Sequence, residues 1–222
     1  MKLKPIVAGL ALMLAAAGAS AMVSVDFGPY TVTYDETTSF GSISSSGSGG
    51  STYSFAWSVP QSVQVASTGA LVTAAFDLPS FTISANPGWN LSGNFNSFFG
   101  NLVFTEIGGA TTGILAYADV SVDGGPAMSV SGGVGWTATG SGPGYLLGYF
   151  GDTSSLPVGA FGSLTVDAAS IVLSASGGVF SSIAAQPQNK LEFSFTAMPV
   201  PEPETYAMLL SGIAVIGWVA RR

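Results

Sequence analysis

Short runs of alternating apolar and polar residues recur through the chain between residues 22 and 199. In residues 53–59 aromatic or branched side chains occupy every second position, and residues 191–196 alternate in the same way. This period of two places apolar side chains on one face of a strand. Gly, Pro and Asn separate about ten to thirteen such runs, and no stretch of this body has the pattern of an amphipathic helix. We therefore predict an all-β domain over residues 22–197, an antiparallel β-sandwich or a jelly-roll-like fold.

The breaks between these runs predict the connections. Asp123-Gly124 and Gly177-Gly178 are residue pairs typical of tight hairpins. Stretches with low complexity or no clear alternation are predicted to be loops or turns, at residues 42–52, 90–100, 132–144 and 151–154.

The first 21 residues have the pattern of a secretory signal peptide. Lys2 and Lys4 precede an apolar segment at residues 6–17, and Ala19 and Ala21 form a small-x-small cleavage pattern. An uncleaved N-terminal membrane anchor is the alternative. Because the apolar segment is short and the cleavage pattern follows at once, we predict export by the Sec route with cleavage after Ala21.

The last 25 residues have a second targeting pattern. Prolines interrupt residues 198–203, an apolar run covers residues 206–220, and Arg221-Arg222 ends the chain. The prolines predict an extended linker. The apolar run and the arginines predict a transmembrane helix at residues 204–220 with a cytoplasmic stop. The run is short for a membrane span, and a buried C-terminal helix is the alternative.

This C-terminal pattern resembles the PEP-CTERM sorting signal of Gram-negative bacteria. The resemblance rests on Val200, Pro201, Glu202 and Pro203, on the apolar run and on the Arg221-Arg222 pair. It implies transient anchoring in the inner membrane, recognition by an exosortase near Pro-Glu-Pro, and delivery to the cell surface or the extracellular matrix. Bacteria with this signal make exopolysaccharide and biofilm material, so exopolysaccharide is a candidate partner. The resemblance implies no activity for the body, because the signal is attached to many unrelated domains.

Composition excludes much chemistry in the body of the chain. The sequence contains no Cys and no His, which removes disulfides, thiolate ligands, the usual neutral-pH base and the Ser-His-Asp arrangement. Residues 22–199 hold ten carboxylates and one lysine, Lys190, for a net charge of −9. This charge repels phosphates, so nucleic acid is excluded as a partner. We expect a non-enzymatic protein without cofactors, with its carboxylates in contact with solvent.

One stretch resembles the start of a calcium loop. Asp119, Ser121 and Asp123 occupy alternate positions before Gly124, but Val130 stands where such a loop carries its bidentate Glu. The alternative is the polar face of a strand that leads into a hairpin. We favour the hairpin and predict no metal site here.

Two tryptophans beside turns are candidate sugar-binding residues. Trp89 and Trp136 could stack on the apolar face of a sugar, whereas Trp57, on a strongly alternating run, is predicted to lie in the core. The sequence therefore favours an exported structural protein of the cell surface or matrix. The alternatives are a carbohydrate-binding module and an enzyme that uses carboxylates or calcium.

Overall fold

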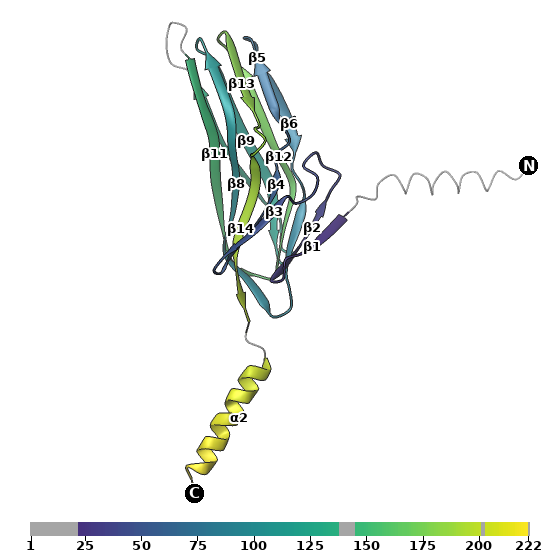
Figure 1. Cartoon of the computed structure of the whole chain (residues 1–222), viewed down its shortest axis with the longest axis vertical. Helices are drawn as coiled ribbons and strands as arrows, with labels where there is room; N and C mark the ends of the chain where they lie inside the picture. Colours follow the sequence, from purple (N-terminus) through teal and green to yellow (C-terminus); the bar gives the residue numbers. More distant parts are fainter. Residues whose placement is uncertain (1–21, 138–144, 201–202, 222) are drawn as a thin grey trace, which may run out of the picture.

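The computed structural model describes residues 22–137, 145–200 and 203–221 and consists of two antiparallel sheets followed by one helix (Figure 1). Each sheet has seven strands, and apolar side chains from both sheets fill the space between them. The predicted all-β sandwich-like architecture is confirmed. The predicted signal peptide, with Ala19 and Ala21, lies outside the described residues.

The first sheet has the strand order β1-β2-β7-β12-β9-β10, with β6 also paired to β12. The second has the order β3-β4-β14-β8-β13-β5, with β11 also paired to β8. The strands of the first sheet are β1 (Met22–Asp26), β2 (Tyr30–Asp35), β6 (Val72–Asp77), β7 (Phe81–Ala85), β9 (Thr111–Val122), β10 (Met128–Thr137) and β12 (Ser163–Ser176). Those of the second are β3 (Ser45–Gly49), β4 (Thr52–Ser58), β5 (Gln64–Ser67), β8 (Trp89–Ile107), β11 (Tyr145–Phe161), β13 (Phe180–Ala184) and β14 (Lys190–Pro199).

Each sheet is built around one long strand. In the first sheet, β12 pairs with β9 along one side, while β7 and then β6 share its other side. In the second, β8 pairs with β11 along one side, while β14 and then β13 share the other. Backbone hydrogen bonds on both sides hold each long strand, so stretches with weak intrinsic strand preference are kept extended.

Three stretches predicted to be irregular are strands because neighbouring strands pair with them, on both sides only in the case of β8. Residues 42–52 contain the edge strand β3, residues 90–100 belong to β8, and residues 151–154 belong to β11. Of the predicted loop at residues 132–144, the first part continues β10 as far as Thr137, and residues 138–144 lie outside the described residues. Pairing across the sheet outweighs the local composition in each case.

The two predicted hairpins have different outcomes. Asp123 and Gly124 both have positive φ, at 51° and 68°, and the Gly125 N–H donates to the Val122 carbonyl at 2.9 Å, which confirms a tight turn between β9 and β10. Gly177 and Gly178 also have positive φ, but they connect β12 of the first sheet to β13 of the second, so the predicted hairpin is wrong there.

Aromatic side chains dominate one part of the core. Phe55 and Trp57 of β4 are fully buried, and their ring centroids lie 5.5 Å apart. Phe81 of the first sheet lies 4.7 Å from Phe193 of the second, measured between ring centroids. Burial of each such side chain stabilises the fold by about 1.5–3 kcal/mol, and edge-to-face pairs add to this. The predicted core position of Trp57 is confirmed.

The C-terminal helix α2 (Pro203–Val219) is separate from the sandwich (Figure 1). It coincides within one residue with the helix predicted at residues 204–220. Its 17 residues correspond to about 26 Å, less than the ~30 Å of a bilayer core. Within residues 22–137, 145–200 and 203–221, no helix meets the length and apolarity needed to cross a membrane, so the prediction of a transmembrane span is not supported.

Candidate functional site

The C-terminal segment leaves the sandwich at the end of β14. Ala197 is buried, whereas Met198 and Val200 are about half exposed. The Val200 N–H donates to the Gly88 carbonyl at 2.8 Å, which ties this point of the chain to the start of β8. Val200, the first residue of the predicted sorting motif, therefore lies at an accessible boundary of the folded domain.

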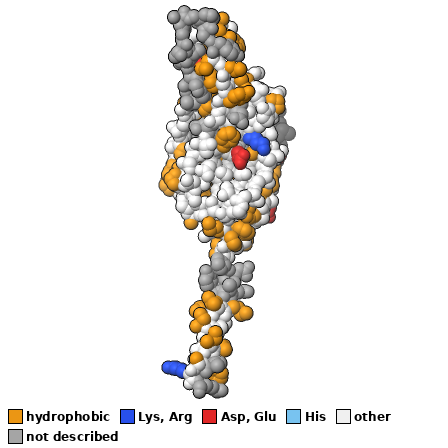
Figure 2. All heavy atoms as spheres, turned by 60° about the vertical axis from the view of Figure 1, so that its left-hand side comes forward, with side chains coloured by type: hydrophobic (Ala, Val, Ile, Leu, Met, Phe, Trp, Pro, Cys, Tyr) orange, Lys and Arg blue, Asp and Glu red, His pale blue; other side chains and the backbone are white. Residues whose placement is uncertain are grey.

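Helix α2 presents apolar side chains to its surroundings on all sides. It begins at Pro203, a residue favoured at the first helical position because its fixed φ suits the helix and its missing N–H has no partner there. Figure 2 shows apolar side chains along the visible face of the helix and a basic side chain near its end. Arg221 follows the helix, while Pro201, Glu202 and Arg222 lie outside the described residues. The large apolar residues of α2 that are exposed are Met208, Leu209, Leu210, Ile213, Val215, Ile216 and Trp218.

The predicted calcium candidates lie on β9 and in its turn, where their carboxylates have protein partners. Asp119 accepts a hydrogen bond from the Ser129 hydroxyl on the neighbouring strand at 2.6 Å. Asp123 accepts two backbone N–H groups, from Gly162 and Ser163, each at 2.8 Å. Ser121 lies between them on β9. The Asp123 carboxylate thus links the β9–β10 turn to the β11–β12 connection.

Asp119 also faces a second carboxylate across the sheet. Asp167 of β12 is its direct partner in the ladder and accepts hydrogen bonds from the Ser80 hydroxyl and the Ala168 N–H, each at 2.8 Å. Two like charges in this position repel each other, and the hydroxyl and N–H donors offset part of that cost. In the described part of the chain, no group of three or more His, Cys, Asp or Glu residues is placed to hold a metal ion.

The two candidate sugar-binding tryptophans are not brought together. Trp89 begins β8, whereas Trp136 pairs with Thr112, beside the turn that follows the other end of β8. Eighteen residues of strand separate these two ends, or roughly 60 Å. Trp89 is half-buried and packs edge-to-face on Tyr53 at 6.3 Å between ring centroids. These two strand positions lie too far apart to share one platform, and a sugar-binding role for either tryptophan stays a prediction.

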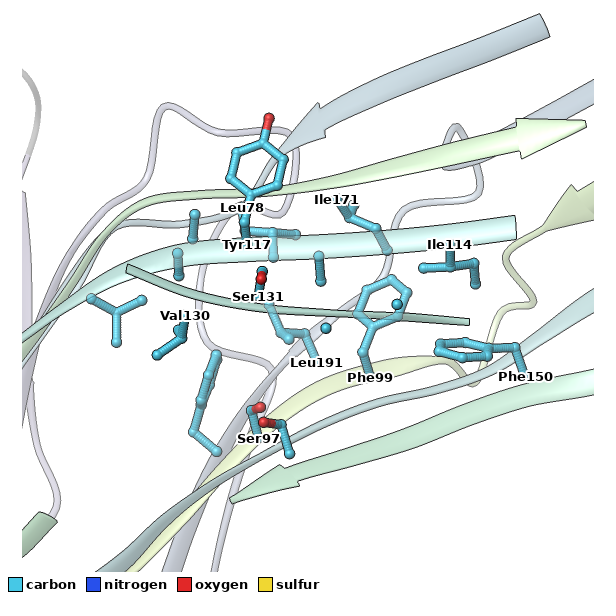
Figure 3. Close-up of a pocket in the computed structure, with 18 residues that line it drawn as sticks. Leu78, Ser97, Phe99, Ile114, Tyr117, Val130, Ser131, Phe150, Ile171 and Leu191 are labelled. Atoms are coloured by element: carbon cyan, nitrogen blue, oxygen red, sulfur yellow. The ribbon is translucent and has the colours of Figure 1, made fainter. Parts of the chain in front are cut away.

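A cavity of about 160 Å³ lies between the sheets on the side of β10 and β11. Figure 3 shows its walls: Ile114 and Ile171 come from the first sheet, and Phe99 and Phe150 from the second, while Tyr117 points away. The cavity exists because several positions along its walls carry small residues. These are Ser97, Ala116, Ala118, Ser131, Gly132, Gly133, Ser154 and Ala169.

The chemistry of this cavity is apolar. Its polar side chains are Ser97, Ser131, Ser154 and Tyr117, whose ring points away, and no Asp, Glu, Lys or Arg is among the described residues that line it. Such walls favour an apolar group and provide neither a general acid nor a base. The cavity therefore does not fit the paired-carboxylate chemistry of a glycosidase.

A buried carboxyl group was not anticipated from the sequence. Glu106 near the end of β8 is fully buried, and its Oε1 accepts the Thr112 N–H at 2.8 Å and the Thr112 hydroxyl at 2.6 Å. Its Oε2 and the hydroxyl of Ser181, its partner on β13, have no hydrogen-bond partner within the described residues. The expectation that the carboxylates contact solvent is wrong for Glu106. Its position among inward-facing residues just before Gly108-Gly109 was the available signal.

Two tyrosines have pKa values raised by the core. Burial raises the pKa of Tyr30, and the neighbouring Tyr53 adds to the effect. Burial also raises the pKa of Tyr34; a hydrogen bond that the Ile43 N–H donates to the phenol oxygen opposes this rise, and Glu36 adds to it. Both phenols remain neutral at physiological pH and serve the packing of the sandwich.

Comparisons with solved structures gave only distant matches. The enzymatically active domain of tailspike protein 4 from bacteriophage CBA120 is 17% identical over 75% of this chain and 19% of that chain, with a TM-score of 0.23. TmCBM61 in complex with β-1,4-galactotriose is 15% identical over 82% and 89%, with a TM-score of 0.17. The infectious bursal disease virus structure, Gx strain, is 11% identical over 68% and 43%, with a TM-score of 0.18. The chain spans about a fifth of the tailspike domain.

Sequence comparisons separate the C-terminal segment from the rest of the chain. Curated protein sequences gave no match. A family model of the PEP-CTERM protein-sorting motif matches residues 199–222. This range contains Val200, Pro201, Glu202 and Pro203, then helix α2 and the two arginines, in the order of the predicted sorting signal. The chain therefore carries a PEP-CTERM protein-sorting motif at residues 199–222.

Proposed function

We propose that this chain is an exported protein of the cell surface or extracellular matrix, sorted by an exosortase that acts at its C-terminal motif. The observation that carries the proposal is the match of residues 199–222 to the PEP-CTERM protein-sorting motif. The position of the motif supports it, because Val200 lies at the exposed end of the sandwich. A cut beyond Val200 leaves every strand of both sheets on the released side.

Helix α2 is the part of the chain that would hold the protein at the inner membrane before sorting. Its large apolar side chains are exposed on all sides, which is unfavourable in water and favourable in lipid. Its length falls short of a full span, so insertion requires local thinning of the bilayer or adjustment by the flanking residues. Arg221, just beyond the helix, suits the headgroup region of the cytoplasmic face.

The sandwich is then a structural, non-enzymatic part of surface or biofilm material. The absence of His and Cys from the sequence and the apolar character of the cavity favour this role over catalysis. The two carboxylates of the calcium candidate, Asp119 and Asp123, accept hydrogen bonds from other groups of the fold.

Mass spectrometry of the protein recovered from cells with and without the exosortase tests the sorting proposal. We expect the extracellular protein from cells with the exosortase to lack Arg222. In cells without the exosortase, the protein should keep Arg222 and remain in the membrane fraction. An intact Arg222 in the extracellular protein of both strains contradicts the proposal.

A matched pair of glutamate variants tests the motif itself. Glu202→Gln changes a residue of the motif, whereas Glu36→Gln changes an exposed glutamate on the sandwich. We expect E202Q to accumulate with its C-terminus intact, and E36Q to be processed like the parent chain. Equal processing of both variants would show that Glu202 has no part in recognition.

A further inference from the structure

The flank of the sandwich formed by β10 and β11 has two open sheet edges. Within the described residues, β10 pairs only with β9, and β11 pairs only with β8. Figure 1 shows β11 along the outer side of the second sheet, beside β8. The outer side of each strand therefore presents unpaired backbone N–H and C=O groups, which are a template for another strand.

These two edges lack most devices that normally prevent pairing. Strand β10 (MSVSGGVGWT) contains no charged residue and no proline, and its register with β9 runs without interruption over ten residues. Strand β11 contains one acidic residue, Asp152, and no basic residue. Two bulges and Pro157 interrupt β11, but the six residues from Gly151 to Leu156 lie between them in regular register. Glycine-rich strands such as β10 are prone to pair with other chains.

Three of the other edges, those of β5, β3 and β1, are better protected, while β6 pairs only with β12 in the described residues and ends at Asp77. Strand β5 has four residues, which is too short to offer a long template. On the edge strand β3, Ser45 accepts a hydrogen bond from the Lys190 ammonium at 3.2 Å, so a lysine lies at that edge. Edge strand β1 ends at Asp26, whose carboxylate accepts the Gly28 N–H and the Asn86 amide, each at 2.8 Å. Short strands, lysines and acidic side chains are the usual means of keeping sheet edges apart.

The distribution of charge also favours contact at the β10/β11 flank over other surfaces. Residues 22–199 carry a net charge of −9, so two copies repel each other over most of their surfaces. Figure 2 brings the side of β11 forward, and the described side chains there are mostly uncharged. Exposed apolar side chains lie on or beside this flank, at Leu115, Tyr117, Met128, Leu147 and Tyr149.

The spacing of the two edges selects the partner. They belong to two sheets packed face to face, which lie about 10 Å apart. A single extended peptide can pair with one edge only. A partner that pairs with both must itself be a two-layer sandwich with two open edges on one flank, and a second copy of this chain has this geometry. We propose that the β10/β11 flank pairs with the same flank of a second copy, with antiparallel strands, so that both sheets continue from one copy into the other.

Cysteine trapping tests this pairing cleanly because the chain contains no cysteine. Ser131→Cys places a single thiol on β10 and Ser155→Cys places one on β11, while Ser48→Cys on the edge strand β3 is the matched control. The full-length protein is used in detergent micelles, where α2 contributes equally to every variant. We expect disulfide-linked dimers from one or both flank variants in large excess over the control. Cross-linking of the control as strong as that of both flank variants would overturn the proposal.

Added negative charge provides a second readout. Met128→Glu and Leu147→Glu each place a carboxylate on the flank, and Val179→Glu places one at a residue that is also exposed but lies outside it. A carboxylate that faces its counterpart in the second copy should weaken association about tenfold in sedimentation measured over a range of concentrations. Association that is equally strong in M128E, L147E and V179E would contradict a flank interface. Neither readout involves the exosortase, so failure here leaves the sorting proposal intact.

Discussion

The space between the two sheets is filled in different ways in two regions. Around Phe55 the rings are close enough to touch, with five aromatic neighbours whose centroids lie between 5.5 and 6.4 Å away. Beside β10 and β11, small residues such as Ala116, Gly132 and Ser154 leave a cavity of about 160 Å³. The same two sheets thus make a dense core in one region and a loose flank in the other, and the flank is also where the sheet edges are open.

The largest expected effect is the loss of a ring from the dense region. Phe55→Ala should lower the free energy of unfolding by about 3–5 kcal/mol, because a fully buried ring is replaced by a void. Phe99→Ala, in the wall of the cavity, removes a ring that is only partly buried and should cost about 2 kcal/mol. Urea denaturation of both variants measures the difference, and equal costs would break the distinction between the two regions.

The next effect concerns Glu106, on the strand that passes through both regions. Glu106→Ala leaves the buried Thr112 N–H and hydroxyl without their acceptor, which should cost about 2–3 kcal/mol. Glu106→Gln keeps an oxygen in place of Oε1 and should cost clearly less. The two variants are compared by urea denaturation at one pH. If Glu106→Ala and Glu106→Gln lower the free energy of unfolding equally, the hydrogen bonds to Thr112 are not what stabilises this end of the sandwich.

Replacement of Ala by Val should change the free energy of unfolding in opposite directions in the two regions. Ala197→Val adds volume at a buried position beside the aromatic core and should destabilise by about 1–3 kcal/mol. Ala116→Val adds the same groups at the cavity wall and should stabilise by about 1 kcal/mol. Thermal and urea unfolding give both values. A destabilising Ala116→Val would mean that the flank has no room to accept the added methyl groups.

A smaller effect should appear at alkaline pH. The pKa of Tyr30 is raised by burial above the ordinary value of about 10, so the folded protein keeps this proton when the unfolded chain loses it. The stabilising contribution is complete below pH 10 and is lost above it, by up to about 1.4 kcal/mol per pH unit. Tyr30→Phe should remove this part of the decline and cost about 1 kcal/mol near pH 8, where the hydrogen bond to the Ser54 carbonyl is lost.

The alkaline prediction is measured as the free energy of unfolding of the parent chain and Y30F between pH 8 and pH 11. The difference between them should shrink as the pH rises above 10. A difference that stays constant over the whole range would show that Tyr30 ionises equally in the folded and unfolded states.

The smallest effect is expected from removal of the C-terminal segment. A chain that ends at Val200 keeps every strand and the hydrogen bond to Gly88, so its free energy of unfolding should change by less than about 0.5 kcal/mol. Calorimetry of the two forms tests this. A large loss of stability would mean that α2 stabilises the dense core. The sandwich and the C-terminal sorting segment would then not be independent.

Several features of the protein follow from local sequence patterns. The alternation at residues 53–59 predicts β4 and the burial of Trp57, because a period of two sorts side chains to opposite faces whichever strand lies beside them. Asp123-Gly124 predicts its turn, because few residue pairs accept positive φ at both positions. The sorting motif is the clearest case, since its parts follow one another directly in the chain.

Other features depended on contacts between segments far apart in the chain. Residues 90–100 show no clear alternation, yet β11 and β14 pair with them on both sides and keep them extended within β8. Gly177-Gly178 forms a turn of the expected kind, but its direction, from one sheet into the other, is decided by the strands that it joins. Local patterns were enough to predict the class of fold, the turn at Asp123-Gly124 and the sorting segment, because each depends on neighbouring residues. The burial of Glu106, the separation of Trp89 from Trp136, and the meeting of two open edges beside a cavity could not be predicted in this way. Each depends on strand order and register, which no local pattern encodes.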